Sequence, residues 1–407
     1  MGNQIVPALR FSKFKVDYQV DQLGSVTDCV DYRGKAPVKS SSGIQLLTAR
    51  NIKKGYLDNT SKEYIPVENY KIVMSKGLPK VGDILFTTEA PLGNVYQIKY
   101  SKIALAQRVI KFRSKKGLSN DYLCHYMLSP YFQKEIQKKS IGTTVKGISN
   151  KALNKLQINY PCPSEQQKIA DFLSSVDKKI EQLTRKKELL EKYKTGMMQK
   201  LFPKAGEQHP ELRFKDENGQ NYPYWDEKKL EQISEIIGGG TPASEIEEFW
   251  EGEINWFTPT EIRSKYVSSS NRRITKLGLK KSSAKLLTKG SILFTSRATI
   301  GEVSFNLEEA STNQGFQNFT EIKANSEFLY QWLKRNKKIF LRKSQGSTFL
   351  EIGKSEIKKV KINLPTKHEQ QKIANFLSAI DDKITKVEGK LTKAQTFKKG
   401  LLQQMFV

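Results

Sequence analysis

Residues 165–180 read EQQKIADFLSSVDKKI, and residues 369–384 read EQQKIANFLSAIDDKI. Twelve of the sixteen positions are identical, at an offset of 204 residues. The match continues without a gap over 142–202 and 346–406. Self-similarity at a fixed offset indicates that the chain contains two copies of one structural unit.

Weaker similarity extends toward the N-terminal side of each copy. Two short motifs recur there: PALRF at 7–11 and PELRF at 210–214, and GDILFT at 82–87 and GSILFT at 290–295. Tyr18 stands where the second copy has Trp225, a difference that we expect to affect packing only. The offset drifts between 203 and 208 residues, so the copies differ by short insertions. Each copy therefore consists of a variable part followed by a nearly constant part.

The constant part follows Pro161 and Pro365 and carries a heptad pattern. Two rows of apolar residues repeat every seven positions in each copy, and Lys187, Lys194 and Lys398 interrupt one row. A pattern sustained over five heptads predicts long helices whose apolar faces form a coiled coil. We expect the helix–helix seam to contain Ile169, Leu173, Val176, Ile180, Leu183, Leu190, Ile373, Leu377, Ile380, Ile384, Val387 and Leu391.

Each predicted helix covers roughly 37 residues, which is about 55 Å at 1.5 Å per residue. A charged helix of this length is not stable by itself, so each seam needs a partner. The obvious partner is the other copy, and a pseudo-two-fold axis would make the two helices antiparallel. Two alternatives stay open at this point: a parallel pair, and helices that each pack on their own globular domain.

The variable parts, about 12–160 and 222–364, differ greatly from each other but both contain short β-rich runs and a helix near their end. The pattern predicts an α+β fold, with two mixed α/β domains in tandem pseudo-two-fold symmetry joined by two long antiparallel coiled-coil helices. We expect a first domain over 1–160, a helix over 161–203, a linker over 204–221, a second domain over 222–364 and a helix over 365–407.

Charge is the strongest signal in the composition. There are 69 Lys and Arg against 42 Asp and Glu, which gives a net charge of +27 at pH 7. The positive electrostatic field of such a charge favours a polyanion as the partner, and nucleic acid is the leading candidate. A solvated basic surface or an anionic membrane are the alternatives. No run of 18 apolar residues is present, and residues 1–10 lack the apolar core of a signal peptide. Three scattered cysteines fit a reducing cytosol, so we expect a cytoplasmic protein without disulfides.

Several loops carry side chains that suit DNA. Arg matches guanine, Asn or Gln matches adenine, and Glu accepts from cytosine, whereas Lys and Thr suit phosphates. The candidates are Arg50, Asn51, Lys53, Gln107, Arg108, Lys146, Thr258, Thr260, Glu261, Arg263, Arg297, Asn313 and Gln314. Each is weak evidence by itself, because any surface loop can hold such residues.

Motifs for catalysis are missing or incomplete. GKS at 353–355 lacks the first glycine of a phosphate-binding loop, since Thr348 stands there. GGGTP at 238–242 lacks the dinucleotide-binding spacing and is interpreted as a flexible turn. Asn221 precedes Tyr222, whereas the adenine methyltransferase tetrapeptide needs proline there. HExxH and CxxC do not occur, so we predict no catalytic residue and no metal site, and the chain is typical of a binder.

These residues resemble a known family. The two helical motifs, the two GDILF-like strands, the stretch GGGTP…INWFTPTEI and the PALRF and PELRF pair are similar to the conserved regions of Type I restriction–modification specificity subunits. The resemblance covers nearly the whole chain, in the order of reading domain, helix, reading domain, helix. The duplicated helical motif is highly specific, and the loop motifs are less so.

The resemblance implies that two target-recognition domains each read one half of a split, asymmetric DNA site, and that the paired helices set the gap between the halves. It implies that two methyltransferase subunits dock on the chain and modify adenines with S-adenosylmethionine. Up to two restriction subunits would use ATP and Mg for translocation and cleavage, while this chain binds no cofactor and is not catalytic by itself. The family's recognition loops fall on the regions of Arg50, Asn51, Lys53, Thr258, Thr260, Glu261 and Arg263.

Two other functions stay open on the sequence. The first is a structural or RNA-binding coiled-coil protein without an enzyme partner, which would show no sequence preference on duplex DNA. The second is a nuclease with an unrecognised carboxylate site, which would cleave DNA by itself in the presence of a metal ion.

Overall fold

The computed structural model describes residues 6–32, 36–106, 108–115, 117–204, 206–346 and 350–407. The chain divides into two compact units, Met1–Arg185 with Glu388–Val407, and Lys186–Val387. The helix α6 (Pro163–Leu201) begins in the first unit and ends in the second, whereas α12 (Lys367–Gln404) begins in the second and ends in the first. The globular part of the first unit is termed head 1, and that of the second unit is termed head 2.

The strands of head 1 form three sheets among the described residues. An antiparallel sheet has the order β2 (Thr27–Asp31), β8 (Val109–Ser114), β5 (Ile84–Thr87), β6 (Val95–Gln97). A second sheet has the order β4 (Glu63–Ile65), β3 (Ile44–Leu47), β7 (Ile103–Leu105), with β3 parallel to β7. A short pair joins β1 (Gln19–Gln22) to β9 (Gln157–Tyr160).

The helices of head 1 are short, and α3 and α4 are the longest of those described there. They are α1 (Leu23–Val26), η1 (Val67–Asn69), α2 (Tyr70–Val73), α3 (Asn120–Leu128), α4 (Pro130–Lys139) and α5 (Asn150–Asn154). Ser129 ends α3 and caps α4, because its hydroxyl accepts from the Phe132 N–H and Pro130 fills the first helical position.

Head 2 repeats this plan, with one more strand in its large sheet. The large sheet has the order β11 (Glu235–Gly238), β18 (Gln317–Thr320), β15 (Ile292–Phe294), β16 (Val303–Asn306), β13 (Tyr266–Val267). The second sheet has the order β14 (Arg272–Ile274), β12 (Trp250–Phe257), β17 (Ala310–Thr312), with β12 parallel to β17. A short pair joins β10 (Asp226–Lys229) to β19 (Lys361–Leu364).

Most helical elements of head 2 occupy places in the order equivalent to those of head 1, whereas η2 and η3 flank β12. They are α7 (Leu230–Ile233), η2 (Glu247–Phe249), η3 (Pro259–Glu261), α8 (Lys276–Lys280), α9 (Ser326–Arg335), α10 (Lys337–Lys343) and α11 (Lys354–Lys358). The three matching sheets confirm the α+β class and the duplication predicted from the sequence. None of the helices in the described ranges is long and apolar enough to cross a membrane.

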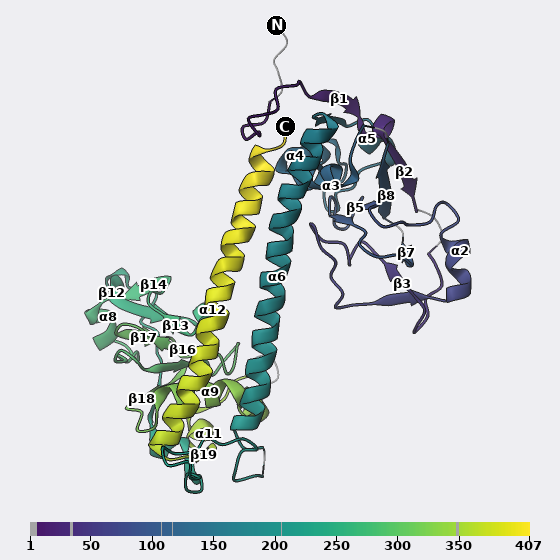
Figure 1. The fold of residues 1–407 in the computed structure, drawn as a ribbon. Coiled ribbons are helices and arrows are strands. Elements are labelled where there is room, and N and C mark those ends of the chain that lie inside the picture. The colour runs from purple at the N-terminus through teal and green to yellow at the C-terminus, as the bar shows by residue number, and fades with distance from the viewer. Residues whose placement is uncertain (1–5, 33–35, 107, 116, 205, 347–349) are drawn as a thin grey trace. The chain divides into compact units, whose positions relative to one another are not determined.

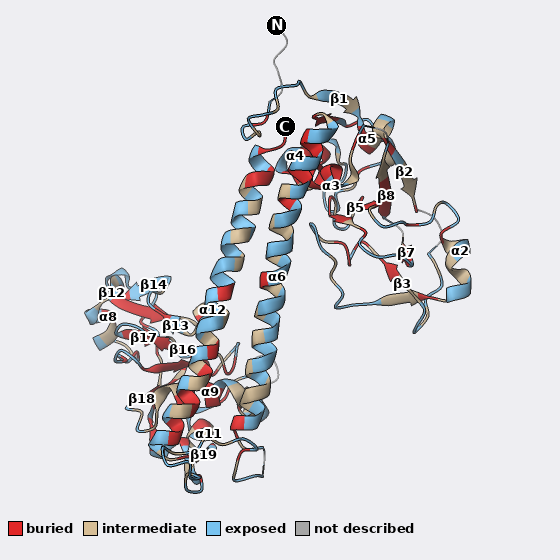
Figure 2. Cartoon of the chain, viewed as in Figure 1, coloured by how far each residue is buried: buried red, intermediate tan, exposed pale blue. Residues whose placement is uncertain are grey.

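Each head encloses the start of one long helix and the end of the other. In head 1, Leu173 of α6 and Phe406, just beyond α12, are buried in one core. The Phe406 ring lies 5.5 Å from that of Tyr122, measured between centroids. In head 2, Phe202 lies 5.2 Å from Phe328 in the same way. Figure 2 shows buried residues where α6 and α12 enter the heads, and exposed residues along their outer faces.

The contacts also give the direction of the helices within each unit. In the first unit, the start of α6 packs near Met405, and Asp177, farther along α6, pairs with Lys398, earlier in α12. The order of contacts is therefore antiparallel, and the start of α6 and the end of α12 lie side by side at head 1 in Figure 1. The start of each long helix packs on the domain that precedes it in the sequence, as one alternative predicted. The end of each long helix packs on the other head.

The twelve residues expected in the seam are all buried or half-buried. Ile169 and Leu173 belong to the core of head 1, and Ile373, Leu377 and Ile380 belong to that of head 2. The outer members of the expected seam therefore contribute to the cores of the heads.

Two of the lysines that interrupt the heptads, Lys194 and Lys398, form ion pairs across the two helices. In the first unit, Lys398 Nζ lies 2.5 Å from Asp177 Oδ1. The His125 ring approaches the same carboxylate at 4.0 Å, and burial lowers the pKa of His125 to about 4. In the second unit, Lys194 Nζ lies 2.6 Å from Asp381 Oδ1, and the Gln331 amide donates to Asp381 Oδ2 at 2.7 Å. A polar layer thus recurs at equivalent places in both units.

The segment before each head is fastened to a helix start by a buried ion pair. Arg10 Nε and Nη2 each donate to Glu165 at 2.8 Å. Arg213 makes the same paired contact with Glu369, at 3.0 and 2.6 Å. Trp225 Nε1 also donates to Glu369, at 3.1 Å, so the replacement of Tyr18 by Trp225 affects hydrogen bonding as well as packing. The stretch marked as a linker in the sequence, 204–221, is therefore docked onto head 2 through Arg213.

Truncation of Phe406 tests how firmly the end of α12 belongs to head 1. We expect Phe406→Ala to lower the free energy of unfolding by about 3–5 kcal/mol, because it leaves a cavity between Tyr122 and Tyr126. Phe397→Ala is the matched control, since that ring is 54% exposed. Denaturant melts of both variants measure the difference, and equal stability of the two would contradict this packing.

Candidate nucleic-acid interface

In head 2, four loops far apart in the sequence meet at one edge. This edge, termed the head 2 rim, consists of 239–241, 258–263, 295–301 and 313–316. The Gly240 N–H donates to Thr312 at 2.9 Å, and the Ser296 N–H donates to Gly315 at 2.8 Å. The Thr299 hydroxyl reaches the Pro259 carbonyl at 3.4 Å. Each loop directly follows or precedes a strand, so the sheets hold the rim in place.

Head 1 forms an equivalent edge. The head 1 rim consists of 48–58, 87–93, residues 106 and 108, and 141–147. The Thr88 N–H donates to Arg108 at 3.0 Å, the Ile148 N–H donates to Thr88 at 3.0 Å, and the Asn94 amide donates to Ile52 at 2.7 Å. Nearly all the residues selected from the sequence as DNA contacts therefore fall on two rims, one on each head.

Glu261 in the head 2 rim has its carboxylate occupied by its own loop. Oε2 accepts from the N–H and the hydroxyl of Thr258, both at 2.7 Å, and Oε1 accepts from the Asn271 N–H at 2.6 Å. Thr258 and Glu261 thereby form a capping box around η3. Because these acceptors are already used, we infer that Thr258 and Glu261 hold the loop in its shape.

The same loop presents two side chains to solvent. Thr260 and Arg263 are exposed, and Arg263 Nε donates to the Thr260 carbonyl at 2.8 Å. This contact leaves the terminal nitrogens of Arg263 directed to solvent. Arg263 is therefore the residue of this loop best placed to meet a phosphate or a base edge.

The other head 2 candidates have partners within the rim. Arg297 Nε and Nη2 donate to Glu351 Oε2 at 2.9 and 2.5 Å, with the Arg297 side chain 42% exposed. Asn313 Oδ1 accepts from the Gly315 N–H at 2.9 Å, and Gln314 Oε1 accepts from the Thr241 hydroxyl at 2.5 Å. These hydrogen bonds order the rim. The amide nitrogens of Asn313 and Gln314 can still donate hydrogen bonds.

Asn51 in the head 1 rim is buried and fully bonded. Its Oδ1 accepts from the N–H and the hydroxyl of Thr48 at 3.0 and 2.9 Å, and its Nδ2 donates to Asp58 and Ser61 at 3.1 and 2.8 Å. An amide with this many partners holds the loop 48–58 closed. It has no free edge for adenine.

The cationic candidates of head 1 are more accessible. Arg50 and Lys146 are exposed, and no described carboxylate lies within ion-pair distance of either. Lys53 lies 3.8 Å from Asp58, and Arg108 Nε lies 2.8 Å from Glu89 Oε1 with its side chain 54% exposed. Gln107 lies outside the described residues.

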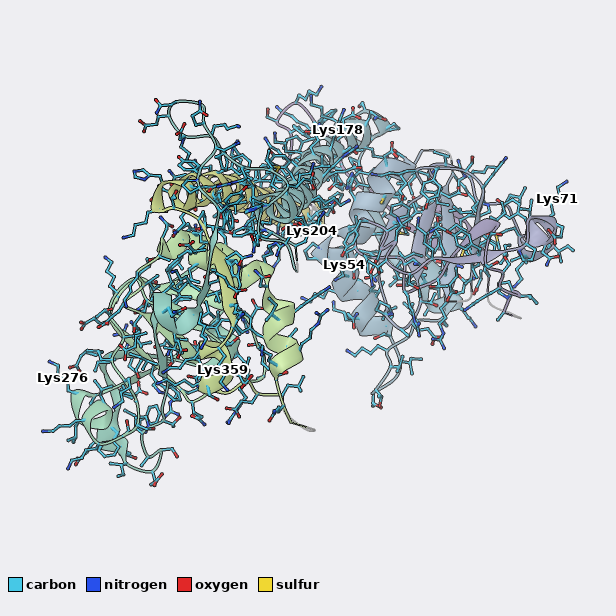
Figure 3. All side chains as sticks on the ribbon, turned by 90° about the horizontal axis from the view of Figure 1, so that it is seen from below. Lys54, Lys71, Lys178, Lys204, Lys276 and Lys359 are labelled. Atoms are coloured by element: carbon cyan, nitrogen blue, oxygen red, sulfur yellow. The ribbon has the colours of Figure 1, made fainter. Side chains whose placement is uncertain are left out.

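Three contributors to the rims could not be recognised from the sequence. Gly239 touches the backbone of the 313–316 loop so closely that a Cβ would lie 1.9 Å from the Asn313 oxygen, so GGGTP supports close approach rather than a flexible turn. Lys54 is an exposed lysine of the head 1 rim, and Figure 3 shows it with other projecting lysines such as Lys276. Arg272 lies beside the head 2 rim and is stacked on Trp250.

The rims offer anion-binding groups rather than catalytic ones. Within the described ranges, no group of three or more His, Cys, Asp or Glu side chains is arranged to hold a metal ion. Guanidinium, ammonium, amide and hydroxyl donors on two separate edges are the groups that bind phosphates and base edges in duplex DNA.

Comparison with known proteins gives a consistent result. A family model described as Type I restriction modification DNA specificity domain matches residues 16–192 and 223–395, once for each copy. The chain is 41% identical over 181 residues to the Type I restriction enzyme MjaIX specificity subunit of Methanocaldococcus jannaschii, covering 43% of this chain and 42% of that relative. The chain therefore aligns with less than half the length of this relative.

Another relative aligns over a longer stretch. The putative Type I restriction enzyme MjaX specificity subunit of the same organism is 28% identical over 350 residues, covering 82% of this chain and 77% of the relative. Among solved structures, the Type I restriction–modification S subunit from M. genitalium superimposes with a TM-score of 0.64 at 18% identity, covering 99% of both chains. This likeness supports the fold.

Proposed function

The chain belongs to the family defined by the Type I restriction modification DNA specificity domain, and we propose that it is the DNA-reading subunit of such an enzyme. Each head reads one half of a bipartite, asymmetric site in double-stranded DNA, and α6 and α12 set the gap between the halves. The chain is not catalytic by itself, and it acts as part of an adenine-specific methyltransferase and an ATP-dependent restriction endonuclease.

One observation carries this proposal. Two heads of the same fold present rims of different composition, and each head encloses ends of both long helices. Dissimilar rims imply dissimilar half-sites, because identical heads would read a palindrome. Two heads on one support bind a split site by avidity, and a wrong spacing prevents simultaneous engagement.

The partners follow from the duplication. A repeated helical surface offers two similar docking places, so we propose that two methyltransferase subunits bind, with up to two restriction subunits beyond them. S-adenosylmethionine, ATP and Mg are assigned to those partners. Methylation of adenine requires the base to leave the stack, so the partner acts on DNA that the two heads hold in place. Host DNA and cysteines in the thiol state suit a cytoplasmic location.

A selection from random duplexes, run on the full chain with a methyltransferase subunit, tests the proposal. We expect enrichment of two short sequences separated by a fixed gap. Enrichment of one continuous sequence, or none, would refute bipartite reading. Binding without sequence preference would favour the structural or RNA-binding alternative, and metal-dependent cleavage by the chain alone would favour a nuclease.

Salt provides a second test of the rims. If the two rims together neutralise six to ten phosphates, affinity should fall by about 10³–10⁵ between 50 and 200 mM salt. The double variant Arg50→Gln with Lys146→Gln should lower the slope of log K against log salt by about two. A matched double variant on surface lysines away from the rims, Lys71→Gln with Lys359→Gln, should leave the slope unchanged. Equal slopes for the two double variants would exclude the head 1 rim as a phosphate-binding surface.

A further inference from the structure

We infer that Arg272 is a specificity-determining residue that reads a guanine in the half-site bound by head 2. The inference rests on the proposed function and adds the residue and the base. The observation behind it is a guanidinium that is exposed, stacked and unpaired beside the rim.

Two tryptophans fix the position of the Arg272 guanidinium. Its Cζ lies 3.4 Å from the centroid of the Trp250 ring and 5.8 Å from that of Trp256. The two rings meet edge to face at 5.1 Å and are buried. Their indole N–H groups donate to the carbonyls of Ala243 and Gly240, at 3.1 and 2.9 Å, so the rings cannot turn freely. Arg272 thus rests on a rigid aromatic platform.

The donors of Arg272 are available. The residue is exposed, and no described carboxylate lies within ion-pair distance of it. By contrast, Arg108 and Arg297 are paired with Glu89 and Glu351. Stacking covers a face of the guanidinium and leaves its edge, which carries parallel N–H donors, free for a planar pair of acceptors. Guanine presents such a pair, O6 and N7, in the major groove.

The surroundings place Arg272 at the reading edge. Trp256, opposite Arg272 in the β12–β14 register, lies two residues before the loop that begins at Thr258. The Asn271 N–H is bound by Glu261, and the Gly240 carbonyl that holds Trp256 belongs to the head 2 rim. This arrangement could not be recognised from the sequence, because Trp250 and Arg272 are 22 residues apart.

Head 1 carries the opposite charge at the equivalent position. In both heads the central strand of the three-stranded sheet has an antiparallel neighbour, and the residue opposite its penultimate position is Arg272 in head 2 and Glu63 in head 1. Glu63 Oε1 lies 2.9 Å from Lys39 Nζ. Both heads would bind the same kind of phosphate backbone, so a cationic phosphate contact shared by the two heads would keep a cation at this position in each. A position at which the charge changes sign between the heads fits a role in reading bases.

The test is the random-duplex selection, made with the full chain and its methyltransferase partner. For Arg272→Gln we expect preference for guanine to fall about ten- to hundredfold at one position of one half-site, with the other half-site and the gap unchanged. Arg272→Lys should restore little of that preference, because an ammonium lacks the paired donors. Trp250→Leu should weaken the preference at the same position by a smaller factor.

Lys276→Gln is the matched control, because Lys276 follows β14 closely and its side chain is 85% exposed. A uniform loss of affinity with an unchanged motif would make Arg272 a backbone contact and overturn the inference. An unchanged motif and affinity would overturn it too. A wild-type chain that selects no split motif would instead refute the proposed function, so the two failures are distinguishable.

Discussion

Insertion of one heptad into α6 alone, by repeating residues 179–185 after Arg185, is expected to abolish methylation of the wild-type site. The insertion adds about 10.5 Å to one helix and nothing to the other. Phe202 at the end of α6 is buried in head 2, and Phe406 beyond α12 is buried in head 1, so both helices connect the same two cores. One core must open, or the cross-helix pairs must break. Methylation assays on wild-type DNA measure the loss.

A matched insertion in both helices is the control for this experiment. Adding a second heptad after Val387 in α12 keeps the rods equal, so both heads should refold around their helix ends. The selected gap should then lengthen by about three base pairs, since 10.5 Å corresponds to that number at 3.4 Å per base pair. Wild-type methylation by the single insertion, or an unchanged gap in the double insertion, would refute the role of the helices in spacing.

The second large effect is expected from Arg213→Met. Glu369 is completely buried, and the change removes its paired guanidinium while leaving the carboxylate in place. Breaking a buried pair by removing one partner costs about 3–5 kcal/mol, so the unfolding transition of head 2 should shift to markedly lower denaturant. Circular dichroism during a urea melt measures this shift.

Two further variants separate charge burial from simple loss of contact. Arg213→Met combined with Glu369→Leu should recover part of the stability, because no unpaired charge stays buried while the Trp225 N–H loses its acceptor. Lys276→Met removes an exposed partner of Glu253 and should leave the melt unchanged. A double variant as unstable as the single one would mean that Arg213 acts mainly through packing.

The helices and the duplication could be predicted from the sequence because their signals are local. Leu173 and Leu377 belong to heptad rows, and a repeated pattern of this kind requires no knowledge of the fold. The exchange of helix ends between the heads could not be predicted in the same way. It depends on contacts such as Tyr122 with Phe406, which are 284 residues apart.

The candidate site could be predicted only by region. The loops after apolar strands, which the sequence marks as candidates, gather on two rims. Residue type could not distinguish side chains that would contact bases from side chains that support a loop. The Asn51 amide and the Glu261 carboxylate, for example, are used in hydrogen bonds within their own loops. Arg272 could not be selected from the sequence, because the tryptophan on which it stacks lies on a different strand. In the same way, Lys194 and Lys398 interrupt the heptads in sequence but are paired across the helices in space.

The most direct test of the account maps methylated adenines, at single-base resolution, in DNA treated with the chain and its methyltransferase partner. The account predicts that modified adenines fall in two different short sequences, always separated by the same number of unspecified bases. Modified adenines in a single uninterrupted sequence, or in two sequences at variable distance, would contradict reading by two heads on a shared pair of helices.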